Sequence, residues 1–309
     1  MVSLAVVILT HNERLHIARA LAQLEPLDAQ VFVVDSGSTD GTPQIAAAHG
    51  ATVLAHPWVN YAQQFQWALD NAPITADWVM RLDADEVIEA DLAAEILREL
   101  PRLPADVMGI NLKRKHVFMG RWIRHGGRYP LVLLRLWRRG KARIEQRWMD
   151  EHMLLLEGRT ATFEGGFADV NLNDIGFFTD KHNRYATREA IDVLNQRLAL
   201  FDRDDHLAAG ADGQASLTRR LKEGLYNRIP FEISATAYFL LRYILQLGFL
   251  DGREGAIYHG LQGFWYRFLV GAKTVEFERA IRGLSRQAAL ERLSQITGHP
   301  VAEPPASAN

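Results

Sequence analysis

The chain has 309 residues, of which 48% are hydrophobic and 23% charged, enough to bury the core of one large domain with or without a smaller C-terminal appendage. Its net charge of −2 gives no bulk attraction to nucleic acid, and the absence of cysteine excludes disulfides, thiolate metal sites and cysteine nucleophiles. The apolar residues 1–10 lack a preceding basic segment and run directly into His11. We therefore expect a buried strand there rather than a signal peptide.

The first part of the chain alternates short apolar runs with helical patterns. The predicted strands cover residues 2–9, 31–35, 51–55 and 78–82, and the predicted helices cover residues 13–24, 42–49 and 61–71. Strands that alternate with helices of this length predict an α/β fold built on a mostly parallel sheet flanked by helices, as in Rossmann-like domains.

Three polar clusters each follow a predicted strand directly, at residues 10–13, 35–40 and 83–86. Ligands of such sheets bind outside the carboxyl ends of the strands. We therefore expect these three loops to meet at one edge of the sheet and to form a binding site there.

The last of these clusters, Asp83-Ala84-Asp85, places two carboxylates within reach of one hard cation. Mg²⁺ and Mn²⁺ prefer oxygen ligands and commonly lie between carboxylates and substrate phosphates. Such a cation stabilises the charge that builds on a diphosphate leaving group. The alternative is a solvated turn with a helix-capping acid.

The second cluster combines the carboxylate of Asp35 with small residues that permit a tight turn before the next helix. It offers a ligand-binding loop, but Ser38 or Asp40 would equally serve as an ordinary cap of that helix. Thr10 and Asn12 have the same two interpretations, and Glu13 would lie in the favourable first turn of its helix.

Together the three motifs resemble inverting glycosyltransferase family two. They are VVILTHNE at residues 6–13, VVDSGSTDGT at residues 33–42 and RLDADE at residues 81–86. The resemblance covers about the first ninety residues in order, spacing and strand context. It implies a GT-A fold, a nucleoside-diphosphate sugar donor, with UDP-sugar favoured, and inversion at the anomeric carbon.

The resemblance also implies residue roles. Thr10, Asn12 and Glu13 would line the nucleoside site, and Asp35 would contact the base or ribose in a donor-binding loop that includes Ser38. Asp83 would lie near the ribose or the metal, and Asp85 would bind Mn²⁺ or Mg²⁺ directly.

An inverting transferase needs a general base to accept the proton of the attacking hydroxyl. Relatives place an acidic residue for this some tens of residues after the Asp-x-Asp motif, and here Asp150 and Glu151 are the candidates. We favour Glu151, with Asp150 as the close second. If this segment is a strand, neighbouring residues point to opposite faces, so only one of the two carboxylates would meet the acceptor. His152 is equally well explained as a structural imidazole.

Residues 181–186, with Glu189 and Ala190, are similar to a signature of the lipopolysaccharide-core and capsule branch of the family. Lys181 and Arg184 lie one helical turn apart and would face the donor phosphates together, or would form a basic turn of a surface helix. At this depth, around residues 181–190, the chain has no Gln-Arg-Trp motif of the kind found elsewhere in the family, which argues against processive polymer synthesis. The tripeptide occurs only earlier in the chain, at residues 146–148. Asp169 lies where some branch members carry a histidine near the metal.

We expect a catalytic domain at residues 1–180, a helical C-terminal region at 181–297 and a flexible tail at 298–309. Residues 231–250 are nearly long enough to span a bilayer but contain three polar interruptions, and residues 264–269 combine aromatic rings with Arg267. We favour peripheral attachment to the cytoplasmic face of the inner membrane, where branch members glycosylate lipid-linked saccharides. Packing on the catalytic domain or in a homodimer, and a true span, are the alternatives.

Residues 113–143 are rich in arginine and lysine, including Arg114 and Arg135. The slightly acidic net charge argues against nucleic acid, and a phosphate-bearing acceptor, an anionic membrane or an ordinary solvated face would explain these residues. Two other functions compete with glycosyl transfer. A sugar-nucleotide nucleotidyltransferase normally has a glycine-rich loop after its first strand, and residues 10–14 contain no glycine. A catalytically inactive membrane-associated scaffold would not need Asp83, Asp85 and Glu151.

Overall fold

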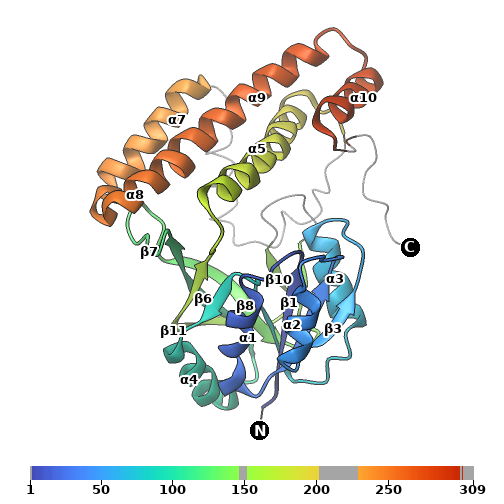
Figure 1. The fold of residues 1–309 in the computed structure, drawn as a ribbon, viewed down its shortest axis with the longest axis vertical. Helices are drawn as coiled ribbons and strands as arrows, with labels where there is room; N and C mark the ends of the chain where they lie inside the picture. Colours follow the sequence, from blue (N-terminus) through green and yellow to red (C-terminus); the bar gives the residue numbers. More distant parts are fainter. Residues whose placement is uncertain (1, 146–151, 202–228, 300, 302–309) are drawn as a thin grey trace. The chain divides into compact units, whose positions relative to one another are not determined.

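The computed structural model describes residues 2–145, 152–201, 229–299 and 301 (Figure 1). The chain divides into two compact units. The first comprises Met1–Asn173 and Gly248–Gly255, and the second comprises Asp174–Leu247 and Ala256–Asn309.

A mixed sheet forms the centre of the first unit, with the strand order β3-β2-β1-β4-β8-β6-β11-β5 and with β7 paired to β6. Its strands are β1 (Leu4–Thr10), β2 (Gln30–Asp35), β3 (Thr52–Ala55), β4 (Trp78–Arg81), β5 (Glu86–Ile88), β6 (Val107–Phe118), β7 (Arg121–Trp122), β8 (Leu131–Arg138) and β11 (Arg159–Val170). The first four strands in this order are parallel, as is the β6–β11 pair, whereas β8, β5 and β7 pair antiparallel with their neighbours. A separate hairpin joins β9 (Ala142–Ile144) to β10 (Met153–Leu155).

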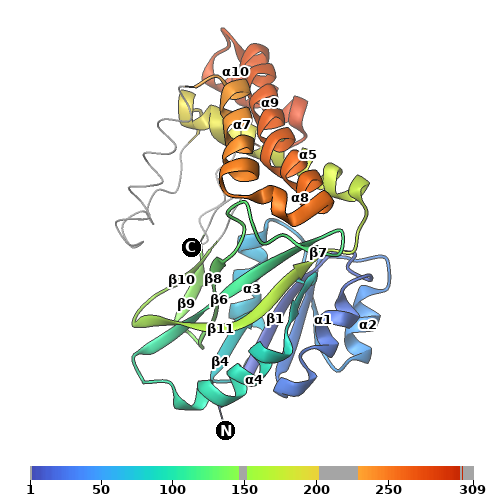
Figure 2. The same cartoon turned by 90° about the vertical axis from the view of Figure 1, so that its left-hand side faces the viewer.

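Helices cover both faces of this sheet, as Figure 2 shows. The covering helices are α1 (Ile17–Ala22), α2 (Thr42–Ala48) and α4 (Ala90–Glu99) on one face and α3 (Tyr61–Asn71) on the other, with the 3₁₀ turns η1 (Glu25–Leu27) and η2 (Leu100–Arg102). Side chains alternate along β1, so Val6 and Ile8 join the core under α1 while Ala5 and Val7 join the core under α3. The predicted α/β fold is confirmed.

One predicted helix starts later than its sequence pattern indicates. Residues 13–24 were expected to be helical, but α1 begins only at Ile17. Asn12 adopts a left-handed conformation, with φ of 57°, and the residues after it form a turn. This backbone reversal turns the loop after β1 toward the loop after β2 before the helix can start.

The second unit is helical. Its main helices are α5 (Ile175–Leu198), α7 (Phe231–Leu240), α9 (Tyr266–Ile281) and α10 (Arg286–Thr297), with the π-helical turns η3 (Leu241–Leu245) and η5 (His259–Trp265). The predicted helical C-terminal region is thus confirmed. Helix α5 begins at Ile175 rather than at residue 181, because Asp174 accepts a hydrogen bond of 2.8 Å from the Phe177 amide and caps it.

A short piece of the C-terminal region belongs to the first unit. It contains η4 (Gly248–Asp251) and the start of α8 (Gly252–Tyr258). The Asp251 carboxylate accepts a hydrogen bond of 2.8 Å from the His125 amide and lies 2.7 Å from His125 Nδ1. These contacts fasten η4 to the loop between β7 and β8.

Candidate functional site

The three polar loops do lie along one edge of the sheet. In the β1–β2 register Thr10 lies beside Asp35, and in the β1–β4 register Val7 lies beside Arg81. The parallel strands β1, β2 and β4 therefore end at the same edge, which brings the segment at residues 83–85 to the same side as the two upstream loops.

Asp35 organises the loop after β2. Its Oδ1 accepts hydrogen bonds from the hydroxyls of Thr10 (2.8 Å) and Ser38 (2.5 Å), and its Oδ2 accepts from the amides of Gly37 (3.0 Å) and Ser38 (2.8 Å). Four donors occupy the acceptor sites of a carboxylate that is only 5% exposed. Asp35 thus fixes the shape of the loop, and its contact with a base or ribose stays a prediction.

The loops after β1 and β2 are also bonded directly to each other. The Asn12 amide donates to the Ser38 hydroxyl (2.8 Å), and the Asn12 side-chain oxygen accepts from the Thr39 amide (2.9 Å). The Glu13 amide donates to the Thr42 hydroxyl (2.9 Å) at the start of α2. Thr10, Asn12, Glu13, Asp35 and Ser38, which the motifs predicted to act together, therefore form one connected surface.

Asp83 lies in a cluster of charges. Its carboxylate accepts a hydrogen bond from the Tyr61 hydroxyl and lies 3.7 Å from Arg81 Nε and 3.5 Å from Arg135 Nη2. Burial acts to raise the pKa of the Asp83 carboxyl, but the two guanidinium groups outweigh it and hold the pKa well below its usual range. Asp83 is therefore ionised, and Tyr61, Arg81 and Arg135 hold its orientation.

Glu86 lies beneath this cluster and is 1% exposed. It lies 2.7 Å from Arg135 and 3.2 Å from Arg114, and it accepts a hydrogen bond of 3.0 Å from the Asp83 amide. Burial raises the pKa of Glu86 to about 7, against the opposing effect of the two arginines. Arg135 is buried, which corrects the expectation that it belongs to a basic surface for an acceptor or a membrane.

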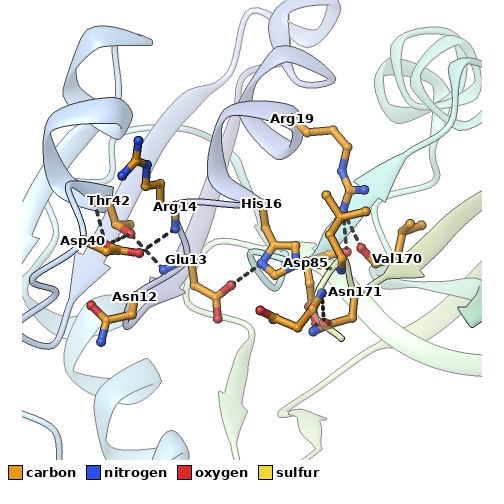
Figure 3. Close-up of polar contacts among 12 residues, drawn as sticks. Asn12, Glu13, Arg14, His16, Arg19, Asp40, Thr42, Asp85, Val170 and Asn171 are labelled. Atoms are coloured by element: carbon orange, nitrogen blue, oxygen red, sulfur yellow. Dashed lines mark hydrogen bonds and ion pairs between the residues drawn. The ribbon is translucent and has the colours of Figure 1, made fainter. Parts of the chain in front are cut away.

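Asp85 has a different environment. Its Oδ2 accepts a hydrogen bond of 2.9 Å from the Asn171 side-chain amide, and its backbone carbonyl accepts from the Val170 amide at 2.9 Å. Arg19 donates to the Val170 carbonyl at 2.6 Å and thereby fastens α1 to the same strand end (Figure 3). The end of β11 therefore positions the second acid of the Asp-x-Asp motif.

His16 connects the loop after β1 to the end of β11. His16 Nδ1 lies 2.6 Å from the Glu13 carboxylate, and His16 Nε2 accepts a hydrogen bond of 2.9 Å from the Leu172 amide, next to Asn171 (Figure 3). Because its Nε2 accepts, the proton of a neutral His16 lies on Nδ1 and points to Glu13. Glu13 and Asp85 are thus parts of one polar site.

The carboxylates near the Asp-x-Asp segment suit a metal ion that the substrate also helps to bind. Among the residues that the structure describes, no three His, Asp or Glu side chains are grouped closely enough to hold an ion by themselves. Mg²⁺ in nucleotide sites commonly takes one or two carboxylates and fills its remaining positions with phosphate oxygens and water. Asp85 is the candidate for that role, since its Oδ2 accepts a hydrogen bond from the Asn171 side-chain amide, while the nearby Arg19 guanidinium also interacts with its charge.

Several of these contact residues were not singled out by the sequence motifs. Tyr61 comes from α3 and Arg19 from α1. His16 lies in the turn before α1, and Asn171 lies in the segment after β11. Asp169, a predicted metal neighbour, lies 3.0 Å from His116 Nδ1 on β6. Tertiary packing brings Tyr61, Arg19 and Asn171 to the motifs, so no local sequence pattern could have identified them. His16 is different, because it lies only three residues after Glu13 and a local pattern could have found it.

The remaining predicted site residues belong elsewhere in the chain. Asp150 and Glu151 lie outside the described residues. Lys181 and Arg184 are on α5 in the second unit, one helical turn apart, and Lys181 Nζ lies 5.9 Å from the centre of the Tyr185 ring. Their contact with donor phosphates stays a prediction.

Comparison with known protein families bears on the first unit. The model of glycosyl transferase family 2 matches residues 5–164, which is more than half of the chain and includes β1 to β4 and the Asp-x-Asp segment. The chain belongs to glycosyl transferase family 2. In this family-2 protein the matched region also includes Tyr61, Arg81 and Arg135, the partners of Asp83.

Individual relatives match different shares of the chain. An uncharacterised glycosyltransferase of Rickettsia typhi is 40% identical over 89 residues, 29% of this chain and 30% of that protein. The match therefore spans less than a third of that relative's length. The lipopolysaccharide core biosynthesis glycosyltransferase LpsC of Rhizobium meliloti is 29% identical over 196 residues, 60% of this chain and 70% of that protein.

Two solved structures are also similar. Mannosyl-3-phosphoglycerate synthase from Rubrobacter xylanophilus is 18% identical, with a TM-score of 0.43, and the match covers 67% of this chain and 78% of that one. Glucosyl-3-phosphoglycerate synthase from Mycobacterium tuberculosis, solved with Mn²⁺, UDP and glucosyl-3-phosphoglycerate, is 24% identical, with a TM-score of 0.31, over 37% of this chain and 44% of that one.

Proposed function

We propose that the protein is an inverting glycosyltransferase that transfers a sugar from a nucleoside-diphosphate sugar, in particular a UDP-sugar, to a saccharide acceptor of the cell envelope. The observation that carries this proposal is the convergence of the β1, β2 and β4 loops, with Asp85 at their centre, in a family-2 chain. The name of the Rhizobium meliloti relative supports an acceptor that is a lipid-linked saccharide, as in lipopolysaccharide core assembly.

In this proposal Asp85 binds a divalent cation, Mn²⁺ or Mg²⁺, which when bound neutralises charge on the leaving diphosphate. Asp83, ionised and held by Tyr61 and two arginines, accepts hydrogen bonds from ribose hydroxyls. The connected surface of Thr10, Asn12 and Glu13 forms the nucleoside side of the pocket.

During transfer the acceptor oxygen forms a bond to the anomeric carbon as the bond from that carbon to the phosphate oxygen breaks. The nucleoside diphosphate leaves with the bonding electron pair, and the acceptor hydroxyl proton passes to a carboxylate. We assign that carboxylate to Glu151, with Asp150 as the alternative. Attack from the side opposite the leaving group inverts the anomeric configuration.

The first test is hydrolysis of a panel of nucleotide sugars with and without Mn²⁺. A glycosyltransferase slowly releases a nucleoside diphosphate, a nucleotidyltransferase reacts with pyrophosphate to give a nucleoside triphosphate, and a scaffold does neither.

Asp85→Asn should keep the fold and lose metal-dependent donor binding in calorimetry, because the direct ligand loses its charge. Asp70→Asn, which changes an exposed carboxylate on α3, is the matched control. Unchanged donor affinity in Asp85→Asn contradicts the metal assignment.

The second test addresses the base. Glu151→Gln should bind donor like the unmodified protein and lose transfer to acceptor, by about a hundredfold or more, since a positioned base contributes about 10²- to 10⁴-fold. Asp150→Asn is the paired variant. If Asp150→Asn alone has this effect, the assignment of the base moves to Asp150.

A further inference from the structure

The helix α7 and the turn η3 that continues it expose an apolar face. Between residues 233 and 247 the exposed large hydrophobic side chains are all aliphatic, and two of them, Leu245 and Ile233, are 75% and 60% exposed. We call the following set the α7 face: Ile233, Leu240, Leu241, Ile244, Leu245 and Leu247. Most of these positions recur at helical spacing, so they form one continuous strip.

The same segment turns its only charge inward. Among residues 233–247 only Arg242 is charged, and it is 6% exposed. Its guanidinium donates a hydrogen bond of 3.0 Å to the Tyr238 hydroxyl, and Arg267 stacks 4.8 Å from the centre of the same ring. This arrangement is the reverse of a helix in water, which buries its apolar side and exposes its charges.

The geometry of the segment suits shallow insertion. Within the described part of the chain no single helix is both long and apolar enough to cross a membrane, while Phe231–Leu245 and Gly248–Ile281 meet that composition only as a pair bent by 70°. Five of the six residues of the α7 face lie in residues 240–247, at the end of the first helix next to this bend. An apolar strip at a bend can enter the boundary of the hydrocarbon without crossing it.

We propose that the α7 face is a membrane-binding surface, inserted into the outer hydrocarbon layer of a bilayer. A second copy of the chain is the weaker occupant, because protein interfaces carry about one hydrogen bond per 100–200 Å². From residue 237 to residue 247 the exposed side chains include only one polar group, that of Gln246. Since the face also lacks exposed cations, apolar insertion and not attraction to anionic headgroups drives the binding. This proposal does not depend on the transferase activity.

The experiment is co-flotation of the purified full-length protein with phosphatidylcholine vesicles, at low and at high salt. The protein should float with these neutral vesicles, and neither salt nor added phosphatidylglycerol should change the bound fraction by more than about twofold, since screening acts on charge alone. Leu245→Glu and Leu241→Glu should each lower vesicle partitioning about tenfold or more, because burial of one leucine side chain corresponds to at least that factor.

Leu97→Glu is the matched control, since Leu97 is a 53% exposed leucine on α4 in the first unit. It should float like the unmodified protein, and the circular dichroism spectra and thermal unfolding midpoints should be the same for all variants, which shows that they are folded. Failure of the unmodified protein to float, or flotation that requires phosphatidylglycerol and is lost at high salt, overturns the proposal. A dimer by light scattering that Leu245→Glu converts to a monomer, with equal flotation of both, overturns it in favour of a second copy.

Discussion

At the scale of residues, the three carboxylates at the β1, β2 and β4 edge of the sheet differ in the groups that surround them. Asp35 accepts four hydrogen bonds from its own and the adjoining loop, and Asp83 is paired with two arginines. Asp85 is held by the neutral amide of Asn171. Identical carboxylates can therefore take different roles: a loop organiser at Asp35, an ion-paired hydrogen-bond acceptor at Asp83 and, in the proposed function, a metal ligand at Asp85, because the surrounding groups differ.

Asn171→Ala tests the role of the residue that orients Asp85. Loss of a group that positions a ligand commonly costs about 10- to 100-fold in metal affinity. We expect Mn²⁺ affinity in the presence of a nucleoside diphosphate to fall by that factor in calorimetry, with the thermal unfolding midpoint little changed. Asn71→Ala on α3 is the control, and equal Mn²⁺ affinity in both variants contradicts the assigned role.

At the scale of elements, the packing of α4 against β11 depends on a glycine. A Cβ added to Gly165 would lie 2.5 Å from Leu92 Cα and 2.6 Å from Leu92 N, both backbone atoms that cannot rotate away. Two amides next to each other in β11, those of Glu164 and Gly165, donate to the Glu95 carboxylate at 3.1 and 2.7 Å. The absence of a side chain at residue 165 allows this close approach.

Gly165→Ala should therefore destabilise the fold by about 1–3 kcal/mol, the usual cost of overpacking. Denaturant unfolding of the first unit measures the change. Gly260→Ala is the matched control, because an added Cβ there meets nothing within 4 Å. A Gly165→Ala variant as stable as the unmodified protein shows that α4 can shift at no cost.

At the scale of the whole molecule, Glu86 connects three strands that are distant in the sequence. It lies in β5 and contacts Arg114 in β6 and Arg135 in β8. Its pKa rises from an ordinary value of 4.5 to about 7 in the folded protein. A group whose pKa is raised by folding contributes stability that is fully present below its unfolded pKa and is lost as the pH rises through its folded pKa.

The stability of the protein should accordingly fall, relative to that of Glu86→Gln, as the pH rises from about 4.5 to about 7, because only the unmodified protein then acquires a buried charge. Thermal unfolding midpoints of both proteins across this range, measured with a chelator present, give the comparison. Groups that titrate in both proteins cancel in the difference. Parallel pH profiles would show that the arginines keep Glu86 ionised throughout.

The sequence by itself determined the alternation of strands and helices, the helical C-terminal region and the position of the polar clusters at strand ends. These features depend on local periodicity and on residues adjacent in the chain. The predicted helix 61–71 matches α3, whereas the helix expected from residue 13 starts at Ile17, since φ at Asn12 depends on its bonds to Ser38 and Thr39.

Only the tertiary structure decided which partners surround each acid. Arg135 meets Asp83 because the strand order sets β8 beside β4, and Asn171 meets Asp85 because the end of β11 reaches the Asp-x-Asp segment. The same holds for Arg242, whose inward direction is fixed by packing against Tyr238 and not by its apolar neighbours in sequence. Contacts between residues so far apart in the chain leave no local pattern, and the folded backbone alone specifies them.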